Sequence, residues 1–301
     1  MNRREFLAAA GALPLFGLSG RAVARTMLGT AVLDTVSDGH LVLPAAFLFE
    51  PMPQAELAEL RARLGLTGDE LRPECNLALY RDGTNTVLFD AGSGPDFMPS
   101  AGELLASLDA AGVTPEEITH VVFTHGHPDH LWGLIDDFDE LVFPQASYLM
   151  GRAEWDYWWN PATVETIGTA RIPFAVGARR RMEFIEERVQ LFDDGEEILP
   201  GIAAFATHGH TPGHMSFEIR AGGAAAMIVG DAIANDHVAF ARPDWPSGTD
   251  QDLETAARTR SRLIERLAAE GLTMVGFHLP QGGVGRVERA AEGYRFVPAG
   301  G

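Results

Sequence analysis

The sequence predicts an α/β protein built as a sandwich of two β-sheets between layers of helices. From about Thr26 onward, short runs with the residues and spacing of strands alternate with stretches of helical spacing. The expected strands fall into two groups with helices around them, which is the pattern of a layered sandwich. At 46% hydrophobic and 22% charged residues, the chain can also bury a core of ordinary size.

The first group of expected strands lies in the first half of the chain. Residues 30–36 and 40–49 look like paired strands around the turn Ser37-Asp38-Gly39, and residues 77–80 and 86–89 like a second hairpin. A glycine-rich loop follows the second hairpin. The run 118–123 predicts a buried strand, and residues 54–64 and 103–111 have helical spacing.

The second group of expected strands lies in the later part of the chain. It comprises residues 201–207, 215–220 and 224–229, with a final strand at residues 273–277. Residues 251–270 form a long amphipathic pattern that predicts a helix outside the sheets. We find no long linker or short-period repeat that would divide this part of the chain.

The N-terminus has the pattern of an export signal. Arg3-Arg4-Glu5-Phe6-Leu7 is a twin-arginine motif, an apolar stretch of residues 7–18 follows, and Ala22-Val23-Ala24 offers a cleavage pattern. The alternative, a membrane anchor, needs about 20 apolar residues, so this stretch is too short. We therefore expect residues 1–24 to be a twin-arginine signal and residues 25–301 the mature domain, exported to the periplasm or secreted.

Charge and composition exclude several classes of function. The formal net charge of −19 disfavours a nucleic-acid partner, because an acidic surface repels phosphate backbones. The chain contains no lysine, which rules out Schiff-base chemistry. The single cysteine, Cys75, excludes an internal disulfide and a cysteine-based zinc cluster, and we expect it to be a packing residue. A small-molecule substrate is the expected partner.

The most informative local motif is a run of ligand-type residues after the strand 118–123. It reads His125-Gly126-His127-Pro128-Asp129-His130. At the end of a strand, such side chains can converge while the scaffold stays rigid. Histidine nitrogens and aspartate oxygens suit zinc and similar divalent ions. Four candidate ligands within six residues exceed what one tetrahedral ion needs, so the run favours two adjacent metals.

Further candidate ligands follow other expected strands. His208-Gly209-His210-Thr211-Pro212-Gly213-His214 lies between two strands, Asp231 follows an apolar strand, and His278 follows the strand 273–277. Each lies where a loop would reach the same end of the sheets. These positions give the first motif the partners that a two-metal site requires.

This arrangement resembles the metallo-β-lactamase superfamily from about residue 28 to residue 280. The resemblance implies an αββα sandwich with two mixed sheets and a dinuclear site. By position, His125, His127 and His214 would bind the first metal. Asp129, His130 and His278 would bind the second, and Asp231 would bridge both. The ions would be divalent, with zinc expected and manganese, cobalt or iron as alternatives. His210 would orient a ligand through a hydrogen bond, while the roles of His120, His208 and His237 stay open.

Within the superfamily, the chain most resembles the methyl parathion hydrolase and lactonase branch. The similar segments include Asp129-His130-Leu131-Trp132-Gly133 and Phe277-His278-Leu279-Pro280. The resemblance implies attack by a metal-bound hydroxide on a lactone, ester or phosphotriester of a small apolar substrate. Asp129 and Asp231 are the expected catalytic residues. A β-lactamase-like amidase on the same site and a non-enzymatic periplasmic metal-binding protein are the alternatives.

An aromatic group, Trp155-Asp156-Tyr157-Trp158-Trp159, follows the expected strand 147–150. We expect Trp155 and Trp158, with Trp132, to line the substrate pocket, because an aromatic wall would hold an apolar acyl or aryl group. A helix packed on the core, or a contact in a homodimer, is the alternative interpretation of the same residues.

Overall fold

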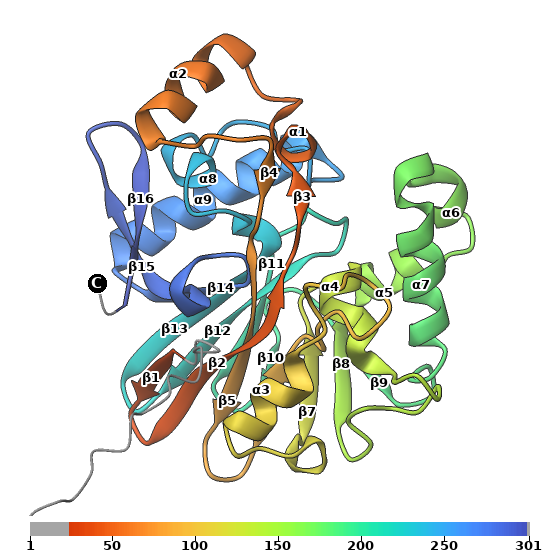
Figure 1. The fold of residues 1–301 in the computed structure, drawn as a ribbon. Helices are drawn as coiled ribbons and strands as arrows, with labels where there is room; N and C mark the ends of the chain where they lie inside the picture. The colour runs from red at the N-terminus through yellow and green to blue at the C-terminus, as the bar shows by residue number, and fades with distance from the viewer. Residues whose placement is uncertain (1–23, 300–301) are drawn as a thin grey trace, which may run out of the picture.

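The computed structural model describes residues 24–299, which form two β-sheets packed face to face with helices on the outside (Figure 1). The predicted signal lies outside the described residues, apart from Ala24, and stays a prediction. In the part of the chain that the structure describes, no helix is both long and apolar enough to cross a membrane.

The first sheet contains strands from the first two-thirds of the chain and is mixed. Its strands, in spatial order, are β1 (Arg25–Leu28), β2 (Ala31–His40), β5 (Glu74–Arg81), β6 (Thr86–Phe89), β7 (His120–Phe123), β8 (Ser147–Gly151) and β9 (Val189–Phe192). Neighbouring strands from β1 to β6 in this order are antiparallel, and neighbouring strands from β6 to β9 are parallel.

The second sheet contains the remaining long strands and is also mixed. In spatial order they are β10 (Glu197–Leu199), β11 (Ile202–Ala206), β12 (Met215–Ala221), β13 (Ala224–Gly230), β14 (Thr273–Gly276), β15 (Val284–Arg289) and β16 (Tyr294–Pro298). Only the β13–β14 pair is parallel among these described strands. A separate small ribbon pairs β3 (Leu43–Pro44) with β4 (Glu70–Leu71).

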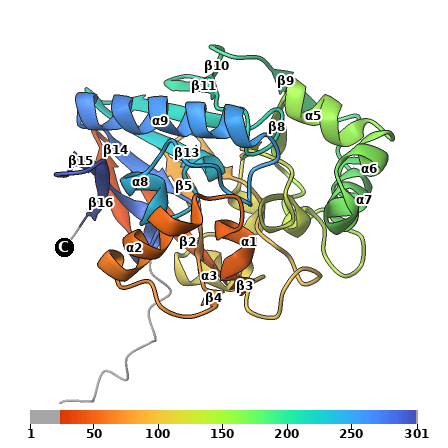
Figure 2. The ribbon, with the colours of Figure 1, turned by 90° about the horizontal axis from the view of Figure 1, so that it is seen from above.

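Helices cover the outer faces of both sheets (Figure 2). The helices are α1 (Ala45–Phe49), α2 (Gln54–Leu64), α3 (Leu104–Ala110), α4 (Pro128–Leu131), α5 (Arg152–Trp159), α6 (Thr163–Thr166), α7 (Ile172–Met182), α8 (Val238–Ala241) and α9 (Leu253–Glu270). Buried side chains of α3, α5 and α7 pack on the first sheet, and those of α9 pack on the second. The predicted αββα sandwich is confirmed.

Side chains alternate between two cores along the central strands. In β7, Val122 belongs to the core between the sheets, whereas Val121 and Phe123 belong to the core beneath the outer helices. Successive strand residues point to opposite faces, so a strand covered on both sides is apolar throughout. This explains why residues 118–123 are recognisable from the sequence as a buried strand.

The predicted hairpin around Ser37-Asp38-Gly39 is wrong. β2 runs unbroken from Ala31 to His40, with a shift of register against β5 between Ser37 and His40. Asp38 is buried, and its carboxylate accepts hydrogen bonds from the backbone N–H groups of Ser93 and Leu104. The turn-type residues therefore form a β-bulge that is held by a distant loop rather than a reversal of the chain.

The segment after β2 also differs from the prediction. Residues 40–49 were expected to be one strand, but they contain the short β3 and the helix α1. Leu48 and Phe49 of α1 are buried against residues of α2 and α8. Most other expected elements are confirmed, including the hairpin β5–β6 and the helices α2, α3 and α9.

The candidate ligands meet at one end of the sandwich because of strand direction. β7 runs parallel to both of its neighbours, and it delivers the segment that begins at Thr124. β13 and β14 are parallel to each other and deliver Asp231 and His278. Carboxyl ends of parallel strands lie at the same edge of a sheet, so loops from the two sheets face each other there.

Replacing Phe217 by alanine tests the core between the sheets. Phe217 is fully buried, and its ring centroid lies 5.2 Å from that of Phe89 and 5.8 Å from that of Phe192. Phe217→Ala should lower the free energy of unfolding by about 3–5 kcal/mol, measured by urea denaturation, because it leaves a cavity. The control Phe138→Ala, at an 84% exposed position, should change it by less than about 0.5 kcal/mol. Equal losses would contradict this assignment of the core.

Candidate metal centre

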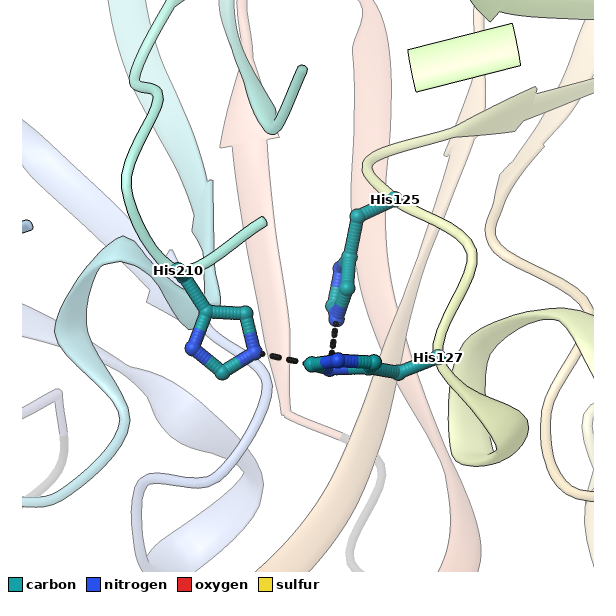
Figure 3. Close-up of side chains that lie close together, drawn as sticks. All are labelled: His125, His127 and His210. Atoms are coloured by element: carbon teal, nitrogen blue, oxygen red, sulfur yellow. Dashed lines mark hydrogen bonds between the residues drawn. The ribbon is translucent and has the colours of Figure 1, made fainter. Parts of the chain in front are cut away.

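Three histidine rings converge where β7 ends and where β11 connects to β12 (Figure 3). His125 Nε2 lies 3.0 Å from His127 Nδ1, and His210 Nε2 lies 2.9 Å from the same His127 atom. All three rings are buried. One ligand nitrogen from each residue therefore points at a common position.

A second group gathers around the carboxylates of Asp129 and Asp231. His278 Nε2 lies 3.2 Å from Oδ2 of Asp129 and 3.2 Å from Oδ2 of Asp231. His130 Nε2 lies 3.4 Å from an oxygen of each carboxylate. Asp231 also reaches the first group, since its Oδ2 lies 3.3 Å from His210 Nε2. Asp231 is therefore shared by both groups, as the bridging role requires.

These separations fit the donor set of a metal ion. Two ligands of one tetrahedral zinc, each about 2.0–2.1 Å from the ion, are about 3.3 Å apart. Three of the atoms form no hydrogen bond that would explain their burial. These are Asp129 Oδ2, His130 Nε2 and Asp231 Oδ1, which are buried without a hydrogen-bond partner. Buried polar atoms are nearly always paired, so this group of unpaired atoms indicates a place for ions.

Each of the five histidines uses one ring nitrogen within the protein and leaves the other for the centre. The partners are Thr124 Oγ1 for His125 Nδ1, the Gln251 amide for His127 Nε2, Asp90 for His130 Nδ1, Asp250 for His210 Nδ1 and the Glu74 carbonyl for His278 Nδ1. Such hydrogen bonds fix the orientation of a metal-binding ring and the position of its proton.

The structure reverses the predicted roles of His210 and His214. His214 Nδ1 is hydrogen-bonded to Thr207 Oγ1, and His214 Nε2 accepts the backbone N–H of Asp231 at 3.0 Å. Both of its nitrogens are therefore used, and it orients Asp231 instead of facing the first group. His210 takes the place expected for His214. Both residues lie in one loop of the sequence, and nothing in their spacing distinguishes them.

The electrostatics of the centre divide the residues into two sets. Burial, with the neighbouring histidines, lowers the pKa of His125 and His127, so both are neutral and can offer lone pairs. Burial alone would lower the pKa of His130 and His278 as well, but Asp129 and Asp231 raise it well above the usual value. The two buried carboxylates thus require positive charge beside them, which bound cations would supply.

Cys75 lies closer to the centre than its sequence position suggests. Its thiol is buried in β5, within 4.8 Å of ligand atoms of Asp129 and His278. Burial raises the pKa of Cys75 to about 12, so the group is a neutral thiol. It fills space beside the second group, which agrees with the expected packing role.

A cavity of about 620 Å³ opens onto the centre. His127, Asp129, His210, Asp231 and His278 lie in its wall, so both groups of ligands reach it. The rest of the wall is largely apolar and comes from several parts of the chain. It includes Leu41, Leu43, Phe47 and Leu48, then Leu66 and Leu71, then Phe97, Met98 and Phe174.

The prediction that Trp132, Trp155 and Trp158 line the substrate pocket is wrong. Trp132, Trp155 and Trp158 are absent from the cavity lining. Trp155 and Trp158 lie in α5 and are buried in the core of the first sheet, which was the alternative interpretation. Trp132 packs edge-on against Phe97, with ring centroids 5.7 Å apart, and so stands behind a lining residue.

Phe97 and Phe174 are lining residues that sequence analysis missed. Phe97 lies in the loop after β6, and Phe174 lies in α7, so neither is close to the metal motif in sequence. Among the histidines whose roles were open, His237 lines the cavity. His120 lies at the start of β7, with its ring hydrogen-bonded to Thr119.

Curated proteins are similar in sequence to part of this chain. The metallo-beta-lactamase domain-containing protein 1 of Xenopus laevis is 31% identical over 134 residues, which are 44% of this chain and 52% of that protein. The N-acyl homoserine lactonase AttM of Azorhizobium caulinodans is 26% identical over 175 residues, which are 56% of this chain and 62% of AttM. The chain thus spans about half to three-fifths of the length of these curated relatives.

Solved structures match over nearly the whole chain. The dizinc quorum-quenching lactonase AidC, in complex with a product, N-hexanoyl-L-homoserine, has a TM-score of 0.86 and 26% identity, covering 93% of this chain and 98% of AidC. The hydrolase AbOPH has a TM-score of 0.85 and 24% identity over the same shares, which shows a common fold. The profile of the metallo-beta-lactamase superfamily matches residues 72–278. The chain belongs to the metallo-β-lactamase superfamily.

Proposed function

We propose that this protein is a metal-dependent hydrolase that opens a lactone or cleaves an ester with an apolar acyl group. One observation carries the proposal: the buried histidines and carboxylates of the centre form part of the wall of a cavity that is otherwise largely apolar. A site built only to store ions has no need of an apolar chamber, whereas an enzyme for an acyl substrate does.

We propose two divalent ions, with zinc expected, as the resident metals. His125, His127 and His210 would hold one ion, Asp129, His130 and His278 the other, and Asp231 both. When bound, such ions polarise a carbonyl oxygen and make water a stronger nucleophile at neutral pH. Histidine nitrogens and carboxylate oxygens suit zinc, and cobalt, manganese or iron can use the same donors.

Asp129 is the candidate for proton transfer. Its Oδ2 faces His278, and the residue also lines the cavity, so the carboxylate lies between the ligand group and the substrate space. Burial would raise the pKa of Asp129, but His130 and His278 lower it well below its usual range, so the carboxylate is ionised at neutral pH. An ionised carboxylate can accept a proton from the attacking water and pass it to the leaving oxygen.

The lining of the cavity would favour substrates that carry an apolar acyl chain. Phe97 and Phe174 lie on its wall beside the ligands, and Leu43 and Leu48 continue the apolar surface. Arg171, Asn235 and Thr249 are polar groups in the same wall that can orient a carbonyl or amide. The acyl chain of a substrate would gain about 0.8 kcal/mol of binding free energy for each methylene group that leaves water.

The relatives support a lactone ahead of the other substrates. AttM and AidC are both named as lactonases, and each is 26% identical to this chain over the matched part. The likeness to the hydrolase AbOPH, at 24% identity, concerns the fold alone and favours no substrate. The amidase alternative has no observation in its favour.

Replacing the shared carboxylate tests the centre. Asp231→Ala should remove ions and activity together, because Asp231 contacts both histidine groups. Elemental analysis after dialysis should give less than one ion per chain, with turnover reduced by at least about 1,000-fold, the scale of one electrostatic catalytic group. The control Asp244→Ala, at a surface pair with Arg242, should keep both ions. Two retained ions with near-normal turnover in Asp231→Ala would contradict the proposal.

Two histidine variants test the corrected ligand set. His210→Ala should bind one ion per chain, because it removes a nitrogen of the first group. His214→Ala should still bind two ions at saturation, with an affinity about 10- to 100-fold lower, because it removes the hydrogen bonds to Thr207 and to the backbone of Asp231 but no nitrogen of the first group. Zinc titration by calorimetry distinguishes the two results, and the opposite pattern would restore the assignment expected from the sequence.

A substrate panel tests the reaction. We expect kcat/KM of the zinc-loaded protein to rise about tenfold for every two methylenes added to the acyl chain of a homoserine lactone, until the cavity is full. An aryl acetate, a phosphotriester and nitrocefin should be slower. Faster turnover of nitrocefin would favour the amidase, and no turnover of any substrate would favour a metal-binding protein.

A further inference from the structure

Glu154 is a buried carboxylate that the proposed reaction does not use. It lies in α5 and is completely buried. Burial raises its pKa, while the hydrogen bonds that it receives oppose the rise. Within residues 24–299 no arginine forms an ion pair with it. A buried carboxylate with no cationic partner is costly, so its position calls for an explanation.

The carboxylate accepts four hydrogen bonds, two on each oxygen. Oε1 accepts the backbone N–H of Gly126 at 2.8 Å and the indole N–H of Trp158. Oε2 accepts the hydroxyl of Thr211 at 2.7 Å and the backbone N–H of Gly213 at 2.9 Å. Three of these donors are N–H groups that cannot act as acceptors.

Three of the four donors, on Gly126, Thr211 and Gly213, belong to the two loops that carry the first group of ligands, and the fourth, Trp158, lies in α5 itself. Gly126 separates His125 from His127, and Thr211 directly follows His210. One oxygen of Glu154 thus holds the loop after β7, and the other holds the loop between β11 and β12. In the second group, the rings of His130 and His278 are held by other residues, namely Asp90 and the Glu74 carbonyl.

The backbone of both loops approaches α5 closely. A Cβ atom at Gly213 would lie 2.0 Å from the backbone nitrogen of Glu154. A Cβ atom at Gly126 would lie 2.5 Å from Nε1 of Trp158. Real contacts of this kind are never so short, so glycine is required at both positions for the loops to reach the carboxylate.

We propose that Glu154 is a positioning residue that sets the metal affinity of the first site by fixing the distance between its two loops. The nitrogens that meet there, on His125, His127 and His210, come from both loops and lie 2.9–3.0 Å apart. A shift of either loop would change that spacing, while the rings of His130 and His278 would keep their own hydrogen bonds to Asp90 and the Glu74 carbonyl. The inference rests on the ligand set of the proposed function, but not on its substrate.

Glu154→Gln is the sharpest test because it keeps the shape of the side chain. In one orientation of the amide, its NH₂ group faces the N–H donors of Gly126 and Trp158, and in the other it faces the N–H of Gly213. A donor cannot accept a hydrogen bond, so at least one hydrogen bond to a ligand loop is lost in either orientation. We expect the zinc affinity of the first site to fall about 10- to 100-fold, the range for groups that orient a ligand. The affinity of the second site should change less than twofold. Calorimetric titration with zinc gives both values.

A double-mutant cycle with His210→Ala separates positioning from a general loss of stability. In the His210→Ala chain the first site is already lost, so adding Glu154→Gln should leave the remaining affinity unchanged. Thr211→Val removes one donor and keeps Glu154, so it should weaken the same site by a smaller factor. This second variant also serves if Glu154→Gln does not fold.

Glu218→Gln is the matched control. Glu218 is a buried carboxylate of β12 that pairs with Arg220 and Arg266 and contacts neither ligand loop. Glu218→Gln should lower the midpoint of unfolding in urea and leave both zinc affinities unchanged. Unchanged affinity in Glu154→Gln and Thr211→Val, equal losses at both sites, or a further loss in the His210→Ala chain would each overturn the inference. Two bound ions with no hydrolysis would overturn only the proposed function.

Discussion

The burial of two aspartates side by side is the constraint on which the centre depends. Asp129 and Asp231 lie away from water within 3.4 Å of histidine nitrogens. Carboxylates in such surroundings need positive charge, and the pKa values of His130 and His278 rise in response. Behind the rings, Asp90, Asp250 and the Glu74 carbonyl hold His130, His210 and His278 in position through hydrogen bonds.

The sandwich supplies the rigidity that this arrangement needs. Parallel strands in both sheets end at the same edge, and the loops after β7, β13 and β14 meet there. The helix α5 adds a further connection, because its aromatic residues pack in the first core while Glu154 turns toward the loops. Packing and hydrogen bonding in one short helix thereby serve both stability and the geometry of the centre.

The cavity and the centre have different structural origins. The ligands follow strands of the two sheets, whereas the apolar wall comes from the segment around α1 and from Phe97 and Phe174. Such connecting segments can vary without disturbing the ligand geometry, which is how one fold serves many substrates. The chemistry of the centre and the choice of substrate are therefore separable properties of this chain.

The layered fold and a set of candidate metal ligands could be predicted from the sequence alone. Buried strands such as residues 118–123 are apolar on both faces and can be recognised from the sequence. The run of histidine and aspartate residues that follows this strand predicts metal binding without knowledge of distant contacts. Tertiary structure decided the rest. His210 and His214 share a loop, and only the contacts of His214 with Thr207 and Asp231 separate their roles. The bulge at Asp38 and the burial of Trp155 and Trp158 likewise depend on segments far away in the chain.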